Sequence, residues 1–193
     1  MPITLVRDLP ALASHTYDLL VIGGGIYGLT VACDAAQRGL AVALIEQGDF
    51  GGGNSFNHLR TIHGGLRYLQ TLDIPRARES VRERRTLARI APWAVAPLPF
   101  VLPLTSSLTR GPLAMRAGFL LDRFVAHDRN TGLGAGHVLP GGVVLSAAAA
   151  RAQYPELRDR PMAGAARWFD YVTVEADRLT LAWGLAAAQA GAQ

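Results

Sequence analysis

The chain has 193 residues, half of them hydrophobic, which is enough for one domain or a domain and a half with a sizeable core. Its net charge of +4 is carried by 19 arginines and no lysine, a bias typical of coding composition, so the basic balance does not indicate a nucleic-acid partner. No run of about 18 apolar residues occurs, so we expect no membrane span, and the single cysteine, Cys33, cannot form a disulfide within the chain.

Residues 1–16 predict a leader with little order that lacks the basic and apolar segments of a secretory signal. The apolar residues 19–22 then predict a buried strand, and glycines follow it in the G-x-G-x-x-G spacing at Gly23, Gly25 and Gly28. In such a turn the first glycine allows the bend, the second lets a pyrophosphate approach the backbone, and the third lets helix and strand pack closely. The helix that follows would direct its unpaired N–H groups and positive dipole end at that phosphate.

A helix is predicted over residues 29–38, with Gly39 as its C-terminal stop, and a second buried strand over residues 40–45. This strand ends at Glu46, 23 residues after Gly23, where an acidic side chain can accept hydrogen bonds from the ribose hydroxyls of an adenosine. Together these elements indicate a nucleotide-binding unit. The alternatives are a glycine turn in an ordinary α/β domain and a Glu46 that is only a surface carboxylate.

The next part of the chain predicts a polar loop over residues 47–62, a return towards helix over residues 63–70, and an arginine-rich helix over residues 75–90. Glu79 and Glu83 lie among the arginines at helical spacing, so ion pairs within the helix are available. We expect a solvated helix face here, with contact to anionic lipid headgroups as the alternative. No aromatic residues interleave with the arginines as a base-stacking platform would require, so we expect no nucleic-acid binding.

Three prolines within residues 97–103 exclude a central strand and favour an edge strand or a crossing between layers, and we place a boundary near them. The remaining patterns predict a helix over 111–126, a glycine-rich loop over 128–142, a short helix capped by Ser146, a strand over 163–174 and an alanine-rich helix over 176–190. A parallel sheet of two strands would leave an open edge, so we expect the fold to need residues beyond Gln193.

These residues carry a family likeness. The run from Tyr17 to Phe50 and the run Ile62-His-Gly-Gly-Leu-Arg-Tyr-Leu69 resemble FAD-dependent glycerol-3-phosphate dehydrogenase, within the D-amino-acid-oxidase-like flavoprotein superfamily. Further likeness lies in residues 79–84, 97–103 and 177–179. The resemblance covers nearly the whole chain but only the first part of a typical family member. The His-Gly-Gly-Leu-Arg-Tyr run is the more specific of its motifs.

The resemblance implies an α/β fold, in which a Rossmann-like FAD-binding domain is interleaved with the start of a substrate (cap) domain and is truncated at the C-terminus. It implies an FAD-binding region with its flavin loop over residues 16–95 and the start of the substrate region over 96–172. Residues 173–193 would form a helix that returns to the FAD domain, whose sheet would be incomplete.

The resemblance also implies roles for individual residues. Backbone groups at the three turn glycines should contact the FAD pyrophosphate, with Glu46 on the adenosine ribose and Ser55 near the pyrophosphate. The residues expected against the isoalloxazine ring are Thr61, Ile62, His63, Gly64 and Gly65. The catalytic candidates are His63, Arg67 and Tyr68; an arginine there suits a substrate phosphate because it can donate two parallel hydrogen bonds. No base for the substrate hydroxyl is assigned.

Some residues depart from the family pattern or allow a second interpretation. Asn54-Ser55-Phe56 and His58-Leu59-Arg60 stand where the family has Thr-Ser-Ser and Ser-Ser-Lys, which bears on the substrate more than on the cofactor. His63 could relay a proton, although we favour a histidine that fixes the Gly64–Gly65 turn by hydrogen bonds to the backbone. The other expectations are core positions for Trp93, Trp168 and Phe169, and a place above the flavin or at a turn for Asp170 and Tyr171.

The predicted function is oxidation of glycerol 3-phosphate or a similar small hydroxylated substrate by hydride transfer to flavin N5, with electrons passing to a membrane quinone. The alternatives are an amine, amino-acid or 2-hydroxy-acid oxidase of the same superfamily and a catalytically silent nucleotide-binding fragment. We expect the chain alone to be inactive, and the protein to be cytoplasmic with a peripheral site on the inner face of the cytoplasmic membrane. No histidine and carboxylate pair has metal-ligand spacing, so no metal is expected.

Overall fold

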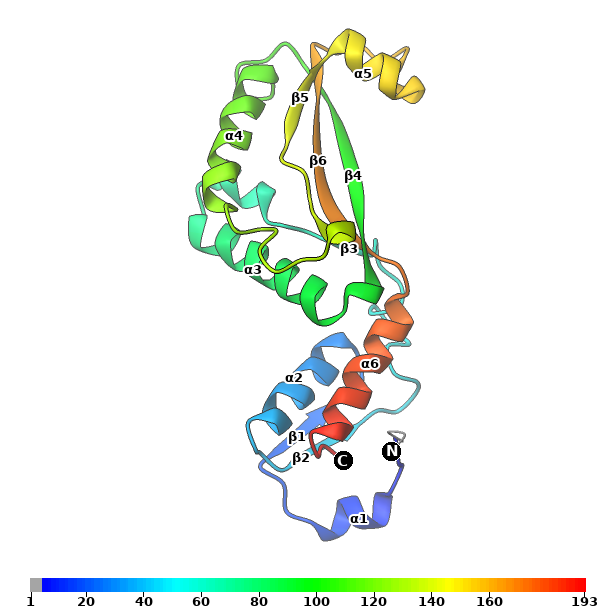
Figure 1. Ribbon diagram of the computed structural model, residues 1–193. Helices are drawn as coiled ribbons and strands as arrows, with labels where there is room; N and C mark the ends of the chain where they lie inside the picture. The colour runs from blue at the N-terminus through cyan, green and yellow to red at the C-terminus, as the bar shows by residue number, and fades with distance from the viewer. Residues whose placement is uncertain (1–4) are drawn as a thin grey trace. The chain divides into compact units, whose positions relative to one another are not determined.

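The structure, a computed structural model, describes residues 5–193 and divides them into two compact units (Figure 1). The first unit comprises the chain up to Arg60 together with Glu175–Gln193, and the second comprises Thr61–Val174. Part of the expected leader, residues 1–4, lies outside the described residues. The rest of it contains helix α1 (Leu9–Ser14), capped by Asp8, which accepts a hydrogen bond from Ala11 N, so the expectation of little order is wrong there.

The first unit is a strand–helix–strand motif with one further helix packed on it. Strands β1 (Leu19–Ile22) and β2 (Val42–Ile45) are parallel, with Leu19 opposite Val42, and α2 (Ile26–Gln37) connects them. Helix α6 (Ala176–Gln189) lies beside α2 (Figure 1). Small side chains on both helices allow this close packing, and the core consists of Val21, Ala32, Cys33, Ala35, Ala36, Val42 and Ala187. The backbone of Gln193 also exchanges hydrogen bonds with Val42 and Leu44 of β2.

The second unit is built around one long strand, β6 (Gly164–Thr173). Strand β4 (Val95–Leu104) pairs antiparallel with β6 along its full length, while β3 (Thr61–Ile62) and β5 (Val143–Ser146) also pair antiparallel with β6. The other elements of this unit are α3 (Ile74–Ile90), α4 (Pro112–Val125), α5 (Ala147–Gln153) and the 3₁₀ helices η1 (Leu66–Thr71), η2 (Pro92–Ala94), η3 (Ala135–His137) and η4 (Pro155–Leu157). The sheet therefore places residues far apart in sequence on neighbouring strands.

The proline-rich segment is an edge strand, as predicted. β4 pairs only with β6 within the described sheet, and Pro97, Pro99 and Pro103 lie opposite Tyr171, Phe169 and Ala165. Alternate residues of a strand direct their N–H groups to the same side, so the three missing donors belong to a single side of β4. The strand can pair with β6 on the other side without losing ladder hydrogen bonds.

Most predicted elements are confirmed within a few residues, and the exceptions are short. The helix expected from residue 29 begins earlier, at Ile26, and Ser146 caps α5 by accepting a hydrogen bond from Ala149 N at 3.2 Å. The predicted polar loop over residues 47–62 is wrong at its end, where Thr61 and Ile62 form β3, and strand β5 was not predicted. The helix predicted over residues 111–126 is confirmed as α4. Among residues 5–193, no helix is both long and apolar enough to cross a bilayer.

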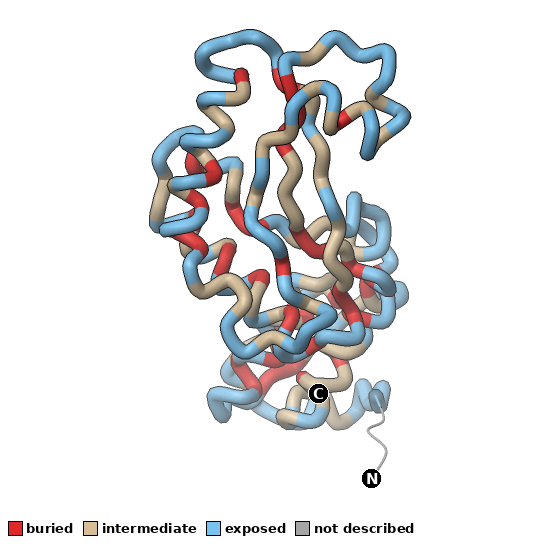
Figure 2. The backbone as a smooth tube through the Cα atoms, turned by 45° about the horizontal axis from the view of Figure 1, so that its top comes forward, coloured by how far each residue is buried: buried red, intermediate tan, exposed pale blue. Residues whose placement is uncertain are grey.

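The arginine-rich helix α3 is not simply a solvated face. Its buried residues, Ala77, Val81, Arg84 and Ala88, recur at every third or fourth position (Figure 2 colours the whole chain by burial). Arg78 and Arg85 both pair with Asp128, which follows α4, at 2.6 and 2.5 Å, rather than with the glutamates of their own helix. Arg84 is buried and pairs with Asp170 of β6. Three of the arginines therefore join elements of the second unit.

We predict that Asp128→Asn destabilises the chain at neutral pH by about 1 to 2 kcal/mol, the range for an arginine-paired carboxylate that solvent still partly screens. The hydrogen bond from Arg78 is the largest of the effects that lower the pKa of Asp128, with Arg85 adding to it. A lowered folded-state pKa stabilises the fold above the unfolded value of about 4, and this stabilisation is lost as the pH falls below it. Urea unfolding should therefore show a difference between wild type and variant at about pH 7 that shrinks towards about pH 2.

The matched control is Asp159→Asn, an exposed carboxylate of the same unit. Its effect should stay within about 0.5 kcal/mol. Equal effects of the two substitutions, or an Asp128 effect that does not depend on pH, would contradict this account of the Asp128 ion pairs.

Candidate active site

The glycine turn after β1 has the geometry that its spacing predicts. Gly23 has φ of 108°, a conformation that favours glycine, and its N–H donates to the Ile45 carbonyl of β2 at 2.8 Å. A Cβ added at Gly28 would lie 1.9 Å from the Gly23 carbonyl oxygen. Helix α2 therefore approaches the end of β1 more closely than any side chain at residue 28 would permit.

Ser55 lies at the N-terminus of α2. Its Oγ accepts a hydrogen bond from Ile26 N at 2.8 Å, and a Cβ added at Gly25 would lie 3.2 Å from the same oxygen. A hydroxyl that accepts in this way keeps its own hydrogen available to donate. Together with the unpaired N–H groups of the first turn of α2, this donor makes the helix N-terminus suited to an anion such as a pyrophosphate.

Glu46 lies against the glycine turn rather than apart from it. Its Oε2 accepts from Gly24 N at 2.6 Å and its Oε1 from Gly48 N at 2.8 Å. These backbone hydrogen bonds, that from Gly24 first, lower the pKa of the Glu46 carboxyl, so the side chain is a negatively charged acceptor at neutral pH. The side chain is half-buried, so part of it is still accessible to a ligand.

In the second unit, a buried ion pair holds the loop that follows β3. Asp170 Oδ1 pairs with Arg84 Nη1 and accepts from Gly64 N at 2.8 Å, while Oδ2 lies 3.3 Å from Nδ1 of His63. The side chains of Arg84 and Asp170 are each 5% exposed, whereas that of His63 is 68% exposed. A Cβ added at Gly64 would lie 2.0 Å from Arg84 Nη1, so only glycine leaves room for the guanidinium.

This geometry corrects two expectations. The Gly64–Gly65 turn is fixed by the carboxylate of Asp170 and not by hydrogen bonds from His63 to the backbone. Asp170 therefore holds the loop before α3 instead of capping the turn next to it. Tyr171 is a core residue, 1% exposed, whose hydroxyl donates to the His137 carbonyl.

Arg84 is a buried functional residue that the sequence motifs did not predict, although its position in the helix carried a signal. Arg84 falls on the same face of α3 as the buried residues Ala77, Val81 and Ala88, at the spacing of an apolar stripe. An arginine in such a stripe requires a buried partner. Trp93 was wrongly expected in the core, since it is 47% exposed, whereas Trp168 is half-buried and stacks on Phe100 with ring centroids 5.5 Å apart.

The predicted site residues fall into two groups. Gly23, Gly25, Gly28, Glu46 and Ser55 come together in the first unit, and Thr61, Ile62, His63, Gly64, Gly65, Arg67 and Tyr68 belong to the second. Arg67 of η1 is exposed, and the ring of Tyr68 carries the guanidinium of Arg76 above it at 5.5 Å. His58 is an exposed loop residue whose Nδ1 accepts from Arg60 N.

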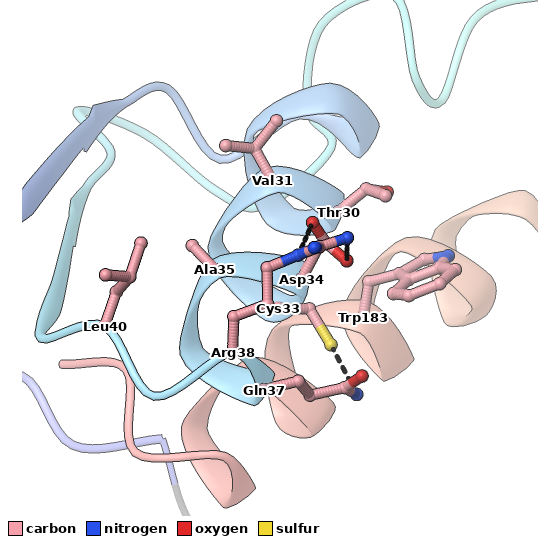
Figure 3. Close-up of a pocket in the computed structure, with 9 residues that line it drawn as sticks. All are labelled: Thr30, Val31, Cys33, Asp34, Ala35, Gln37, Arg38, Leu40 and Trp183. Carbon is pink, nitrogen blue, oxygen red and sulfur yellow. Dashed lines mark hydrogen bonds and ion pairs between the residues drawn. The ribbon is translucent and has the colours of Figure 1, made fainter.

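A shallow hollow of about 480 Å³ lies elsewhere on the first unit, between α2 and α6. Figure 3 shows Trp183 of α6 beside Cys33 and Asp34 of α2. Burial raises the pKa of the Cys33 thiol, and Asp34 is paired with Arg38 at 2.8 Å. Among residues 5–193, no group of three or more histidines, cysteines or carboxylates is placed to hold a metal ion.

Comparison with known proteins yields concordant matches. The family model described as FAD dependent oxidoreductase matches residues 18–193. A glycerol-3-phosphate dehydrogenase from Synechocystis is 37% identical over 187 residues, which cover 97% of this chain and 32% of that protein. The chain thus spans about a third of the length of this curated relative.

Two solved structures share the fold. The glycerol-3-phosphate dehydrogenase from Bacillus halodurans, complexed with FAD, matches with a TM-score of 0.63 and 24% identity over 95% of this chain and 27% of that chain. L-proline dehydrogenase from P. horikoshii matches with a TM-score of 0.62 and 17% identity over 93% of this chain and 43% of that chain. At these identities the likeness establishes the fold alone.

We predict that Gly28→Ala destabilises the first unit by about 3 kcal/mol, because its methyl group would force α2 away from β1. The matched control is Gly118→Ala in helix α4, where an added Cβ has nothing within 4 Å and should stabilise by about 0.5 to 1 kcal/mol. Urea unfolding monitored by circular dichroism measures both. A Gly28 variant as stable as wild type would contradict the close strand–helix contact.

We also predict that Arg84→Leu destabilises the second unit by about 3 to 5 kcal/mol, because it leaves the Asp170 carboxylate buried without its countercharge. Arg82→Leu, on an exposed position of the same helix, should change stability by less than about 0.5 kcal/mol. If both variants unfold at the same urea concentration, the ion pair does not hold this unit together.

Proposed function

The chain belongs to the FAD-dependent oxidoreductase family, and on that basis we propose that the protein oxidises glycerol 3-phosphate or a similar small hydroxylated substrate. A hydride would pass from the carbinol carbon of the substrate to flavin N5, and the electrons would then pass to a quinone. The observation that carries the proposal is the 37% identity to a glycerol-3-phosphate dehydrogenase across nearly the whole of this chain.

The residues of the first unit fit FAD. Any Cβ at Gly28 would meet the Gly23 carbonyl, so the close packing that a dinucleotide turn needs is present. The N-terminus of α2 and the Ser55 hydroxyl would hold the pyrophosphate, and the charged carboxylate of Glu46 would accept hydrogen bonds from the adenosine ribose. When bound, FAD supplies the hydride acceptor.

The residues of the second unit fit the substrate side of the reaction. The guanidinium of Arg67 is exposed and can donate two parallel hydrogen bonds to a phosphate. The exposed imidazole of His63 can exchange a proton with a hydroxyl, and the hydroxyl of Tyr68 can orient a polar substrate. We further propose that residues 61–65 contact the isoalloxazine ring. We also propose a cofactor region over residues 16–95, a substrate region over 96–172 and a helix over 173–193 that returns to the cofactor region.

A second candidate is an amine, amino-acid or 2-hydroxy-acid oxidase of the same superfamily. It is supported by the fold likeness to L-proline dehydrogenase, which acts on an amino acid according to its name. Arg67, two residues after Gly65, favours a phosphorylated substrate over an amino acid. A quinone acceptor implies contact with a membrane, so we propose a peripheral location on its inner face.

The proposal is tested by anaerobic reduction of the flavin in a full-length protein that contains this chain, because the chain alone, about a third of the length of its curated relative, is expected to be inactive. The protein should be yellow, and glycerol 3-phosphate should bleach the flavin absorbance, whereas L-proline and glycine should not. Reduction by an amino acid alone would favour the second candidate. A colourless protein that does not take up FAD would contradict both and leave a silent nucleotide-binding fragment.

We predict that Glu46→Gln weakens FAD binding by about 10- to 100-fold, because the charge-assisted hydrogen bonds to the ribose become neutral ones. Asp177→Asn, an exposed carboxylate in the first turn of α6, is the control and should leave the affinity unchanged. Flavin fluorescence titration measures both dissociation constants. Equal affinities of wild type and the Glu46 variant would remove Glu46 from the cofactor site.

A further inference from the structure

We propose that Asp170, held by Arg84, fixes the imidazole of His63 in the tautomer that carries its proton on Nδ1, so that Nε2 is an unprotonated acceptor. The inference assigns positioning roles to Asp170 and Arg84, which the sequence motifs do not assign. It rests on the proposed function only for the role of Nε2 as the acceptor of the substrate hydroxyl proton.

The carboxylate of Asp170 has its two oxygens assigned to different partners. Oδ1 faces Arg84 Nη1 and accepts from Gly64 N at 2.8 Å, while Oδ2 faces Nδ1 of His63 at 3.3 Å. The carboxylate cannot rotate freely, because rotation would break both contacts of Oδ1. Asp170 is 3% exposed, so water does not compete for these positions.

The chemistry of the facing atoms then selects the tautomer. A carboxylate beside a guanidinium ion only accepts hydrogen bonds, so the imidazole nitrogen that faces it must donate. A neutral imidazole with its proton on Nδ1 has a lone pair on Nε2. The ring is held by little else: it is mostly exposed, and its nearest described aromatic contact is the tilted ring of Phe100 at 6.1 Å.

Under the proposed function, this arrangement gives the substrate hydroxyl a proton acceptor. The hydroxyl proton would go to Nε2 of His63 as the carbon-bound hydrogen leaves as hydride to the bound cofactor, so the alcohol loses two hydrogens and becomes a carbonyl. Asp170 and Arg84 are positioning residues in this scheme, since they act through His63. The charged groups that face His63 are Asp170 from β6 and, behind it, Arg84 from α3.

The test is ¹⁵N NMR of the histidine rings in the FAD-loaded protein, at a pH where the imidazoles are neutral. His63 should show a protonated Nδ1 and an unprotonated Nε2. His137 provides an internal comparison of the opposite kind, because its Nε2 lies 2.8 Å from the Pro92 carbonyl and must carry the proton. A His63 ring with its proton on Nε2 in the wild-type protein would overturn the proposal, independently of the tautomer found in any variant.

Asp170→Asn should reverse the tautomer of His63. The amide oxygen would stay with Arg84 and Gly64 N, so the NH₂ group would face Nδ1 and force that nitrogen to accept. Asp128→Asn is the matched control, because it removes another arginine-paired carboxylate of the same unit that does not contact His63. An unchanged His63 tautomer in a folded Asp170 variant would overturn the proposal.

Activity gives a second readout. Asp170→Asn should lower kcat by about 100- to 10,000-fold, the range for loss of a positioned proton acceptor, with KM nearly unchanged. A fall confined to KM would contradict the positioning role. The two proposals fail separately: no reduction of flavin by glycerol 3-phosphate would overturn the proposed function, whereas a wrong tautomer would overturn this inference alone.

Discussion

The buried ion pair between Arg84 and Asp170 is the constraint on which the second unit depends. It connects helix α3, the central strand β6 and the loop that follows β3 through a single carboxylate. Such a pair adds little net stability, because removing two charges from water offsets their attraction. The ion pair instead favours one arrangement of these elements, because any other arrangement that separates Arg84 from Asp170 would leave a charge buried without a partner. Gly64, Arg84 and Asp170 are therefore mutually dependent, since the guanidinium occupies the space that a side chain at residue 64 would need.

In the first unit, the loop after β2 is held in place by hydrogen bonds from backbone N–H groups and not by a buried ion pair. The segment after β2 returns to the glycine turn, where Glu46 accepts from Gly24 N and Ser55 accepts from Ile26 N. The two contacts join residues that are 22 and 29 positions apart in the sequence, and both reach the glycine turn. The unit thus presents one carboxylate, one hydroxyl and a helix N-terminus close together, and these are the groups that a dinucleotide with a ribose and a pyrophosphate requires.

The predictable part of this fold is the part encoded by local patterns. β1, α2 and β2 follow from apolar runs and glycine spacing, and the edge position of β4 follows from its prolines. β3 has only two residues, too few for a periodic pattern to show, whereas β5 is as long as β1 and β2 and its apolar residues could have predicted it. The pairing of Asp170 with Gly64 spans 106 residues and depends on the register of β3 with β6, which no local signal carries. The burial of Arg84 could have been predicted from the sequence, because Arg84 lies in the apolar stripe of α3.

The prolines of β4 have a consequence for the protein in a crowded solution. A sheet whose outermost strand offers a full row of N–H groups invites a strand from another molecule to add to it. Pro97, Pro99 and Pro103 remove three donors from the same side of β4, so an incoming chain would find carbonyls without the amides needed to continue the ladder. The same residues that let β4 pair with β6 thus discourage intermolecular strand addition, and with it aggregation.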